Sequence, residues 1–182
     1  NVRPPLFKEE HEGLATRVEV YHCKECNAET TNFPRYNSPK TLMKTLKGRC
    51  GEYANLFGFY CRALGFQTRY ILDFTDHVWT EIYSPRLGRW IMCDSCEGVM
   101  DAESMYEKGW GKKLNWVLAF DKHSIRDVTR RYTRRFTSDE FQQRRRQVCP
   151  SGEVHSAMVI AQFNSELRYS SGLNEKQLEE LD

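Results

Sequence analysis

The spacing of the apolar residues changes abruptly at Gly65, and this change limits the folds that the chain can adopt. From residue 50 to residue 64, apolar side chains recur at the period of one helix face, at Tyr53, Leu56, Phe57, Tyr60, Cys61 and Leu64. Gly65 can end this helix, because glycine readily adopts the left-handed conformation that follows many last helical turns. Beyond it the apolar residues alternate with a period of two, which is typical of half-buried strands. We therefore predict one long helix followed by a sheet.

Three strands are expected after the helix, at residues 68–74, 77–83 and 89–94. The last two form a hairpin, because residues 84–87 have the composition of a tight turn. Further elements are expected on both sides of this region: a strand at 17–21, a helix at 40–47, a short helix at 101–110 and a strand at 114–120. A long helix followed by antiparallel strands predicts an α+β fold.

The charge of the chain argues against two classes of partner. It carries 27 basic and 25 acidic residues, for a net charge of +2, so it has no overall attraction to nucleic acid. No run of about 18 uncharged apolar residues occurs, so no membrane span is expected. A basic stretch at residues 130–135 has few aromatic side chains that could stack on bases, and we expect it to be solvated or to face a protein partner. We predict a globular protein that binds neither nucleic acid nor membrane.

Seven cysteines, in two C-x-x-C pairs and three single positions, indicate metal binding and catalysis. In a chain of this size the spacing is more typical of a reducing compartment than of a disulfide scaffold. One interpretation joins Cys23, Cys26, Cys93 and Cys96 in a single zinc site. However, Cys93 lies on a predicted strand and should point toward the core. We favour half a zinc site, made by Cys23 and Cys26, whose other two ligands lie upstream of Asn1 or elsewhere beyond this sequence.

The chain is divided into three parts on this basis. Residues 1–36 form a partial zinc-binding segment, residues 37–136 a catalytic core, and residues 137–182 a helical C-terminal extension with helices expected at 138–147, 157–168 and 175–181. Because the chain begins at Asn1 rather than at Met, we expect a fragment or a processed product.

Cys50 is the leading candidate for a nucleophile. It lies at the first turn of the predicted long helix, directly after Arg49. The positive end of the helix dipole and the neighbouring guanidinium both favour the thiolate, which is the reactive form of cysteine. The alternative is a small buried apolar residue, the role of most free cysteines. We expect that ordinary role for Cys61, and an incidental one for Cys149.

The predicted hairpin supplies a histidine and a carboxylate. If residues 84–87 form a four-residue loop, Tyr83 faces Gly88 and His77 faces Asp94. A carboxylate opposite an imidazole can orient it for catalysis, so we predict a Cys50–His77–Asp94 triad. Asp76 is nearer to His77 in sequence, but its side chain should point to the other face of the strand. The alternative is an ordinary histidine on a half-exposed strand.

Three further residues are candidates for binding substrate. Trp110 lies between two glycines, which is a poor position for a core residue, and exposed aromatic side chains near carboxylates commonly stack on sugars or peptides. Glu97 could hydrogen-bond to sugar hydroxyls. Trp90 is expected on the same face of the hairpin as His77. The alternative for Trp110 is that it covers the edge of the core.

Five motifs together resemble one known family. They are GRCGEYAN at residues 48–55, CRALGF at 61–66, DHVWTE at 76–81, CDSCE at 93–97 and GWGKKL at 109–114. In this order they resemble the cytoplasmic peptide:N-glycanases, over about residues 18–132. Tyr53 departs from the family pattern, where tryptophan is expected. The resemblance implies a papain-related, transglutaminase-like fold in which the long helix carries the nucleophile and packs on an antiparallel sheet, with a zinc knuckle and a helical C-terminal tail.

The resemblance also implies an activity and the residues that perform it. The family cleaves N-glycans from asparagine in misfolded glycoproteins and leaves aspartate, through a thioester intermediate. It implies Cys50 as nucleophile, His77 as general base and Asp94 as orienting carboxylate, with Glu97 and Trp110 contacting the core chitobiose. Cys50 should also supply a backbone N–H to the oxyanion, while the sequence identifies no second donor.

Cofactor, partners and location are expected on the same ground. The family has a structural zinc bound by two C-x-x-C pairs, of which Cys23 and Cys26 match one. Expected partners are unfolded N-glycosylated proteins and a ubiquitin-shuttle factor of the proteasome. The expected location is the cytoplasm, and also the nucleus, in ER-associated degradation. Two alternatives remain: another cysteine enzyme of this fold, or a catalytically silent module that binds the shuttle factor.

Overall fold

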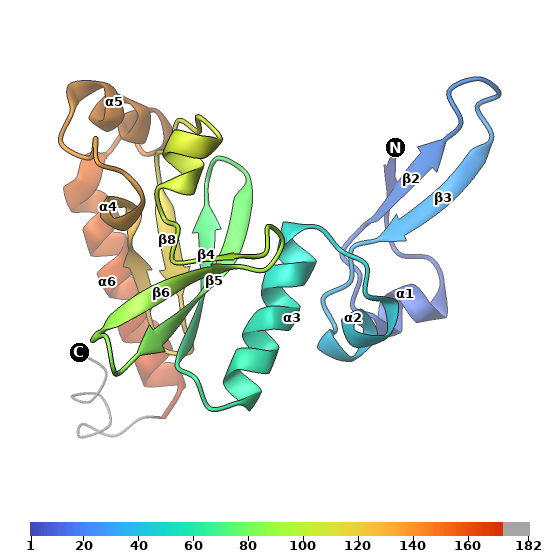
Figure 1. Ribbon diagram of the computed structural model, residues 1–182, viewed down its shortest axis with the longest axis horizontal. Helices are drawn as coiled ribbons and strands as arrows, with labels where there is room; N and C mark the ends of the chain where they lie inside the picture. Colours follow the sequence, from blue (N-terminus) through green and yellow to red (C-terminus); the bar gives the residue numbers. More distant parts are fainter. Residues whose placement is uncertain (173–182) are drawn as a thin grey trace.

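The computed structural model describes residues 1–172 of the chain (Figure 1). A six-stranded antiparallel sheet, in the order β7-β6-β5-β4-β8-β9, forms its centre. The strands are β4 (Thr68–Asp73), β5 (His77–Ser84), β6 (Arg89–Asp94), β7 (Val99–Met100), β8 (Val117–Phe120) and β9 (Ile125–Asp127). The predicted α+β class and the strands predicted at 68–74, 77–83 and 89–94 are confirmed, while the strand expected at 114–120 is the shorter β8.

Helices cover both faces of this sheet. Figure 1 shows α3 (Cys50–Ala63) on one side and the C-terminal helices α4 (Thr129–Tyr132) and α5 (Asp139–Val148) on the other. A short π-helix, η1 (Met105–Gly109), lies where a helix over 101–110 was expected. The last described helix is α6 (Gly152–Ser170), which contacts β9. None of the described helices is long and apolar enough to cross a membrane.

A small separate sheet precedes α3 in the chain. It contains β1 (Val2–Arg3), β2 (Val18–His22) and β3 (Glu29–Pro34), with α1 (Lys8–Glu12) and α2 (Pro39–Thr45) beside it. The strand expected at 17–21 and the helix expected at 40–47 correspond to β2 and α2. The sequence did not reveal α1 or β3, because α1 is short and most of β3 is exposed and so shows no apolar alternation.

Only part of the apolar stripe predicted for α3 is buried. Cys61 is buried, as predicted, and Leu56 and Phe57 are half-buried, but Tyr53, Tyr60 and Leu64 are 38%, 44% and 76% exposed. The helix also turns small residues toward the sheet. The Thr80 hydroxyl donates to the Ala54 carbonyl at 3.0 Å, and a Cβ at Gly58 would lie 3.7 Å from the Thr80 Oγ1. A helix this close to a sheet has no room for large side chains, so small residues decide which face is buried.

The β5–β6 hairpin corrects the predicted register. Tyr83 pairs with Trp90, not with Gly88, so the four-residue loop begins one residue later than expected. Gly88 adopts a φ of +61°, a left-handed conformation that suits the end of a loop and not a paired strand position. The predicted direct pairing of His77 with Asp94 is therefore wrong. Because the register moves by two residues, however, both side chains stay on the same face as diagonal neighbours.

The main core lies on the face of the sheet away from α3. Trp79 stacks on Tyr106 with ring centroids 4.3 Å apart, and the Trp79 indole donates to the Tyr132 hydroxyl at 2.8 Å. Phe141, from α5, is fully buried in the same cluster. α5, which lies in the predicted C-terminal extension, therefore contributes to the same core as the strands. The helices predicted at 138–147 and 157–168 correspond to α5 and α6, while the one predicted at 175–181 lies outside the described residues.

Candidate active site

Cys50 is the first residue of α3. The Glu52 carboxylate accepts a hydrogen bond from the Arg49 backbone N–H at 2.9 Å, which caps the helix directly before the cysteine. The same carboxylate accepts from Arg35 at 2.6 and 3.0 Å. This part of the helix is thus firmly anchored, and the first backbone N–H groups of α3, including that of Cys50, have no acceptor within the helix.

His77 and Asp94 form the second part of the site. His77 Nε2 lies 2.6 Å from Asp94 Oδ2, and the Tyr106 hydroxyl donates to the same oxygen at 2.8 Å. The other oxygen of Asp94 accepts the backbone N–H groups of Cys96 and Glu97 at 3.0 and 3.1 Å. Asp76 is exposed, as expected, and makes no such contact. With Nε2 engaged by Asp94, the ring atom that remains for Cys50 is Nδ1.

The charges of these groups reinforce one another. The hydrogen bond with His77 lowers the pKa of Cys50, against the opposing effect of burial. Burial by itself would lower the pKa of His77, but hydrogen bonds to Asp94 and Cys50 outweigh it and raise the value to about 9. Burial by itself would raise the pKa of Asp94, but the hydrogen bonds from His77 and Tyr106 outweigh it and lower the value. An imidazolium beside an ionised carboxylate is the favoured state at neutral pH, and it shifts Cys50 toward the thiolate.

The other cysteines of the core differ from Cys50. Burial raises the pKa of Cys61, and it raises the pKa of Cys93 to about 12. Cys96 is exposed, but partial burial and the nearby charges of Asp94, Glu97 and Cys50 raise its pKa to about 11. Cys149 lies 3.1 Å from the Ser156 hydroxyl, in the C-terminal helices. Of Cys50, Cys61, Cys93 and Cys96, only Cys50 has a lowered pKa and a histidine partner.

The candidate substrate-binding residues lie in two places. Trp110 is 42% exposed, and its ring centroid is 5.0 Å from that of His77, so it lies directly at the site. Glu97 is exposed in the turn that follows Asp94. Trp90 pairs with Tyr83, which lies six positions along β5 from His77. The Arg69 guanidinium stacks on the Trp90 ring, 4.1 Å from the ring centroid. At about 3.3 Å per residue Trp90 lies some 20 Å from His77, so the structure does not bring it to the other candidates.

Cys23 and Cys26 lie at the tip of the β2–β3 hairpin, which projects away from the catalytic helix (Figure 1). Backbone N–H groups of Cys26 and Glu25 lower the pKa of Cys23, and so does the Cys26 thiol. Such N–H groups favour the thiolate that zinc binds, so this pair fits half of a tetrahedral site. Within residues 1–172 no group of three or more candidate ligands comes together, so the two C-x-x-C pairs do not share one site.

One residue of the site had no signal in the sequence. Tyr106, whose hydroxyl donates to Asp94, was expected only as part of a short helix. Its contact depends on which side chains packing brings together across the sheet. A tyrosine hydroxyl near a catalytic carboxylate leaves no pattern in a single sequence.

A cysteine at the start of a helix, with a histidine and a carboxylate on the adjacent antiparallel strands, is the arrangement typical of cysteine enzymes of the papain and transglutaminase type. The model of the transglutaminase-like superfamily matches residues 7–95 of the chain, and that of the Rad4 transglutaminase-like domain matches residues 74–180. The chain belongs to the transglutaminase-like superfamily.

The relatives at higher identity are amidases. The chain is 57% identical, over 132 residues, to the peptide-N(4)-(N-acetyl-beta-glucosaminyl)asparagine amidase of Arabidopsis thaliana, covering 72% of this chain and 18% of the relative. It is 42% identical over 169 residues to the enzyme of the same name from Yarrowia lipolytica, covering 93% of this chain and 46% of the relative. The resemblance to N-glycanases is confirmed, although the chain spans less than half of these relatives.

A solved structure supports the fold alone. A crystal structure of Rad4–Rad23 bound to a 6-4 photoproduct UV lesion superimposes with a TM-score of 0.56, at 19% identity, over 94% of this chain and 44% of that chain. The likeness shows the same transglutaminase-like arrangement of helix and antiparallel sheet.

Proposed function

We propose that this chain carries the catalytic centre of an amidase that removes N-glycans from asparagine side chains. The observation that carries the proposal is the Cys50–His77–Asp94 arrangement, in a chain whose close relatives are named as this amidase. The substrate is an N-glycosylated protein in which the glycosylated side chain is accessible, as in a misfolded glycoprotein.

The reaction follows from the charge states of the site. The Cys50 thiolate attacks the side-chain amide carbon of the glycosylated asparagine and forms a C–S bond. His77 then donates its proton to the amide nitrogen, the C–N bond breaks, and the glycosylamine leaves. Asp94 stabilises the imidazolium before this step. A water molecule, deprotonated by His77, hydrolyses the thioester, which releases aspartate in the protein and regenerates the thiol.

Trp110 and Glu97 are suited to bind the glycan. The leaving nitrogen must lie next to His77, so the first sugars must lie where Trp110 contacts that histidine. The exposed indole offers a flat apolar surface to a sugar ring, and the Glu97 carboxylate can accept from sugar hydroxyls. We assign the inner two sugars of the glycan to this pair. Trp90 lies too far from His77 to take part.

The main alternative is a catalytically silent module. The structural relative was solved with Rad23. We infer that a ubiquitin-shuttle factor is also a partner of this chain, and α6 presents exposed apolar side chains, including Met158 and Phe163, that a protein could cover. A silent module needs neither a lowered pKa of Cys50 nor a fully bonded Asp94, so the site favours the enzyme.

The test is the product formed at the glycosylation site. A denatured high-mannose glycoprotein is incubated with the chain in ¹⁸O-water, and the former site is analysed by mass spectrometry. We expect aspartate carrying one ¹⁸O, and no release by the Cys50→Ala variant. Binding of the glycoprotein without any conversion to aspartate would contradict the proposed activity and favour the binding module.

A further inference from the structure

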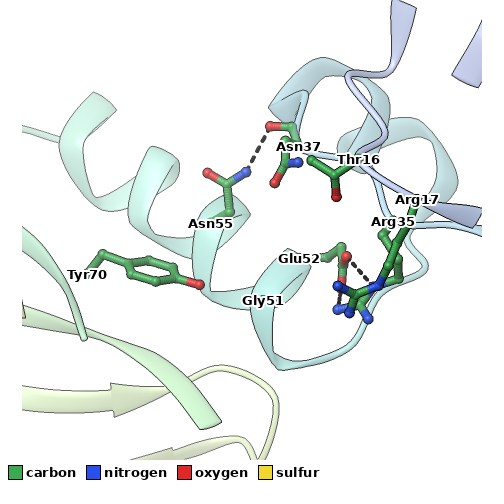
Figure 2. A pocket seen from close by; sticks show the side chains of 8 residues that line it. All are labelled: Thr16, Arg17, Arg35, Asn37, Gly51, Glu52, Asn55 and Tyr70. Atoms are coloured by element: carbon green, nitrogen blue, oxygen red, sulfur yellow. Dashed lines mark hydrogen bonds and ion pairs between the residues drawn. The ribbon is translucent and has the colours of Figure 1, made fainter. Parts of the chain in front are cut away.

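A polar cavity beside Cys50 is not used by the reaction described above. It measures about 480 Å³ and lies between the N-terminal segment and the start of α3 (Figure 2). Its lining residues are Thr16, Arg17, Arg35, Asn37, Gly51, Glu52, Asn55 and Tyr70. Because Gly51 follows the nucleophile and has no side chain, the cavity reaches the backbone next to Cys50. A Cβ at Gly51 would lie 4.0 Å from the Tyr70 hydroxyl.

Most inner donors of this cavity are already engaged. The Asn55 amide donates to the Asn37 carbonyl at 2.8 Å. Arg35 donates to Glu52 and, at 2.9 Å, to Glu19. Tyr70 differs from them. Its half-buried hydroxyl makes no hydrogen bond to any residue within 1–172, and Figure 2 shows it directed toward the first turn of α3.

The Tyr70 hydroxyl is also a dependable donor. Burial, and then the nearby charges of Cys50 and Glu52, raise the pKa of Tyr70 to about 12. The hydroxyl therefore keeps its proton throughout the neutral range. The influence of the Cys50 charge agrees with the placement of this hydroxyl near the nucleophile.

The stereochemistry of the attack leaves one direction for the amide oxygen. When Cys50 adds to the amide carbon, the nitrogen, the oxygen and the side-chain carbon occupy separate corners of a tetrahedron. The nitrogen must face His77, which protonates it. The oxygen must then point to other donors around the sulfur, and the start of α3 with its free backbone N–H groups provides one.

We propose that the Tyr70 hydroxyl is the second donor to the oxyanion, acting together with the backbone N–H of Cys50. The inference rests on the proposed amidase function, and it assigns the cavity to the asparagine side of the substrate. Tyr70 would donate a hydrogen bond to the amide oxygen as the C–S bond forms. The bond would be retained when water attacks the thioester, because that step creates a second oxyanion at the same carbon.

The experiment compares two reactions of the Cys50 thiolate in the Tyr70→Phe variant. Acylation by p-nitrophenyl acetate passes through a tetrahedral oxyanion, whereas alkylation by iodoacetamide displaces iodide and forms none. We expect the acylation rate and the deglycosylation kcat to fall by about 10²-fold, as for other oxyanion donors. The rate of alkylation and its dependence on pH should stay within about twofold of wild type. Tyr60→Phe, on the exposed side of α3, is the matched control and should leave all three unchanged.

A second variant separates the hydroxyl from the fold. Tyr70→3-fluorotyrosine retains the donor and should restore most of the acylation rate, and buried Cys61 and Cys93 should remain unlabelled by iodoacetamide in every variant. The inference would be overturned if Tyr70→Phe lowered the acylation and alkylation rates equally. It would also be overturned if the variant were acylated at the wild-type rate. If wild type acylates but does not deglycosylate, the proposed function fails, while the acylation comparison still decides the role of Tyr70.

Discussion

Tyr106 and His77 bind the same oxygen of Asp94, at 2.8 and 2.6 Å. The second oxygen accepts two backbone N–H groups from the turn that follows. Every side of the carboxylate is therefore occupied, and the carboxylate cannot rotate away from the imidazole. The ring of His77 is fixed with one nitrogen toward Asp94 and the other available to Cys50. This arrangement also places His77 to lower the pKa of the Cys50 thiol.

Asp94→Asn should strongly reduce turnover. The amide keeps the shape of the side chain but removes the charge that orients and stabilises the imidazolium, and in a serine-protease triad the same change costs about 10⁴-fold in kcat. Release of glycan from a denatured glycoprotein measures the effect. Asp76→Asn is the control, since Asp76 is exposed and asparagine tolerates its φ of +68°. Normal turnover by Asp94→Asn would contradict the triad.

The pH dependence of kcat/KM should show an alkaline limb near pH 9. His77 has its pKa raised to about 9, so it keeps the proton needed by the leaving nitrogen up to that pH and loses it above. On the acidic side the rate should fall as the Cys50 thiolate is protonated, at a pH below the ordinary range of thiols because its pKa is lowered. Asp94→Asn should move the alkaline limb to lower pH. If the alkaline limb of the wild-type profile lay near pH 6.5 instead, the pKa of His77 would not be raised and the prediction would be wrong.

Iodoacetamide at limiting concentration should label Cys50 before the other thiols of the core. Its lowered pKa increases the fraction of thiolate at a given pH, whereas burial raises the pKa of Cys61 and of Cys93. Peptide mass spectrometry follows the order of labelling while glycan release is assayed in parallel. The prediction is wrong if activity survives complete labelling of Cys50.

Glu81→Ala should destabilise the fold by about 3–5 kcal/mol, because it leaves a buried charge without its partner. Glu81 is fully buried and accepts from Arg69, Tyr132 and, at 3.1 Å, Arg131. Urea unfolding provides the measurement. Arg89→Ala, which removes the exposed pair with Asp101 near the same hairpin, should cost no more than about 1 kcal/mol. A similar loss of unfolding free energy in both variants would show that burial of the Glu81 charge does not determine the cost.

Zinc should protect the tip of the β2–β3 hairpin. If Cys23 and Cys26 form half of a zinc site, added zinc should slow the alkylation of both thiols, and a Cys23→Ser variant should remove the protection of Cys26. Cys149, which lies in the C-terminal helices, is the internal control and should label at the same rate with and without zinc. Unchanged labelling of Cys23 and Cys26 at saturating zinc would exclude a site at this hairpin.

Local features of the chain could be predicted from the sequence. The start of α3 at Cys50, its end before Gly65, and the strands β4, β5 and β6 follow from residues close together in the chain. The predicted zinc pair also lies at a hairpin tip, a local structure. The burial of Cys61 could be predicted in the same way, but the packing of small α3 residues on the sheet could not, because the close contact of Gly58 with Thr80 involves a distant strand.

The amino-acid sequence by itself determined the class of fold and the candidate residues Cys50, His77 and Asp94, because helix period, strand alternation and helix-start chemistry act over a few residues. Only the tertiary structure decided how those partners meet. His77 reaches Asp94 diagonally rather than directly, since the conformation of Gly88 sets where the loop ends. Tyr106 contacts Asp94, Tyr70 lines the cavity beside Gly51, and Trp90 lies away from His77, because packing of distant segments determines which side chains share the space around Cys50.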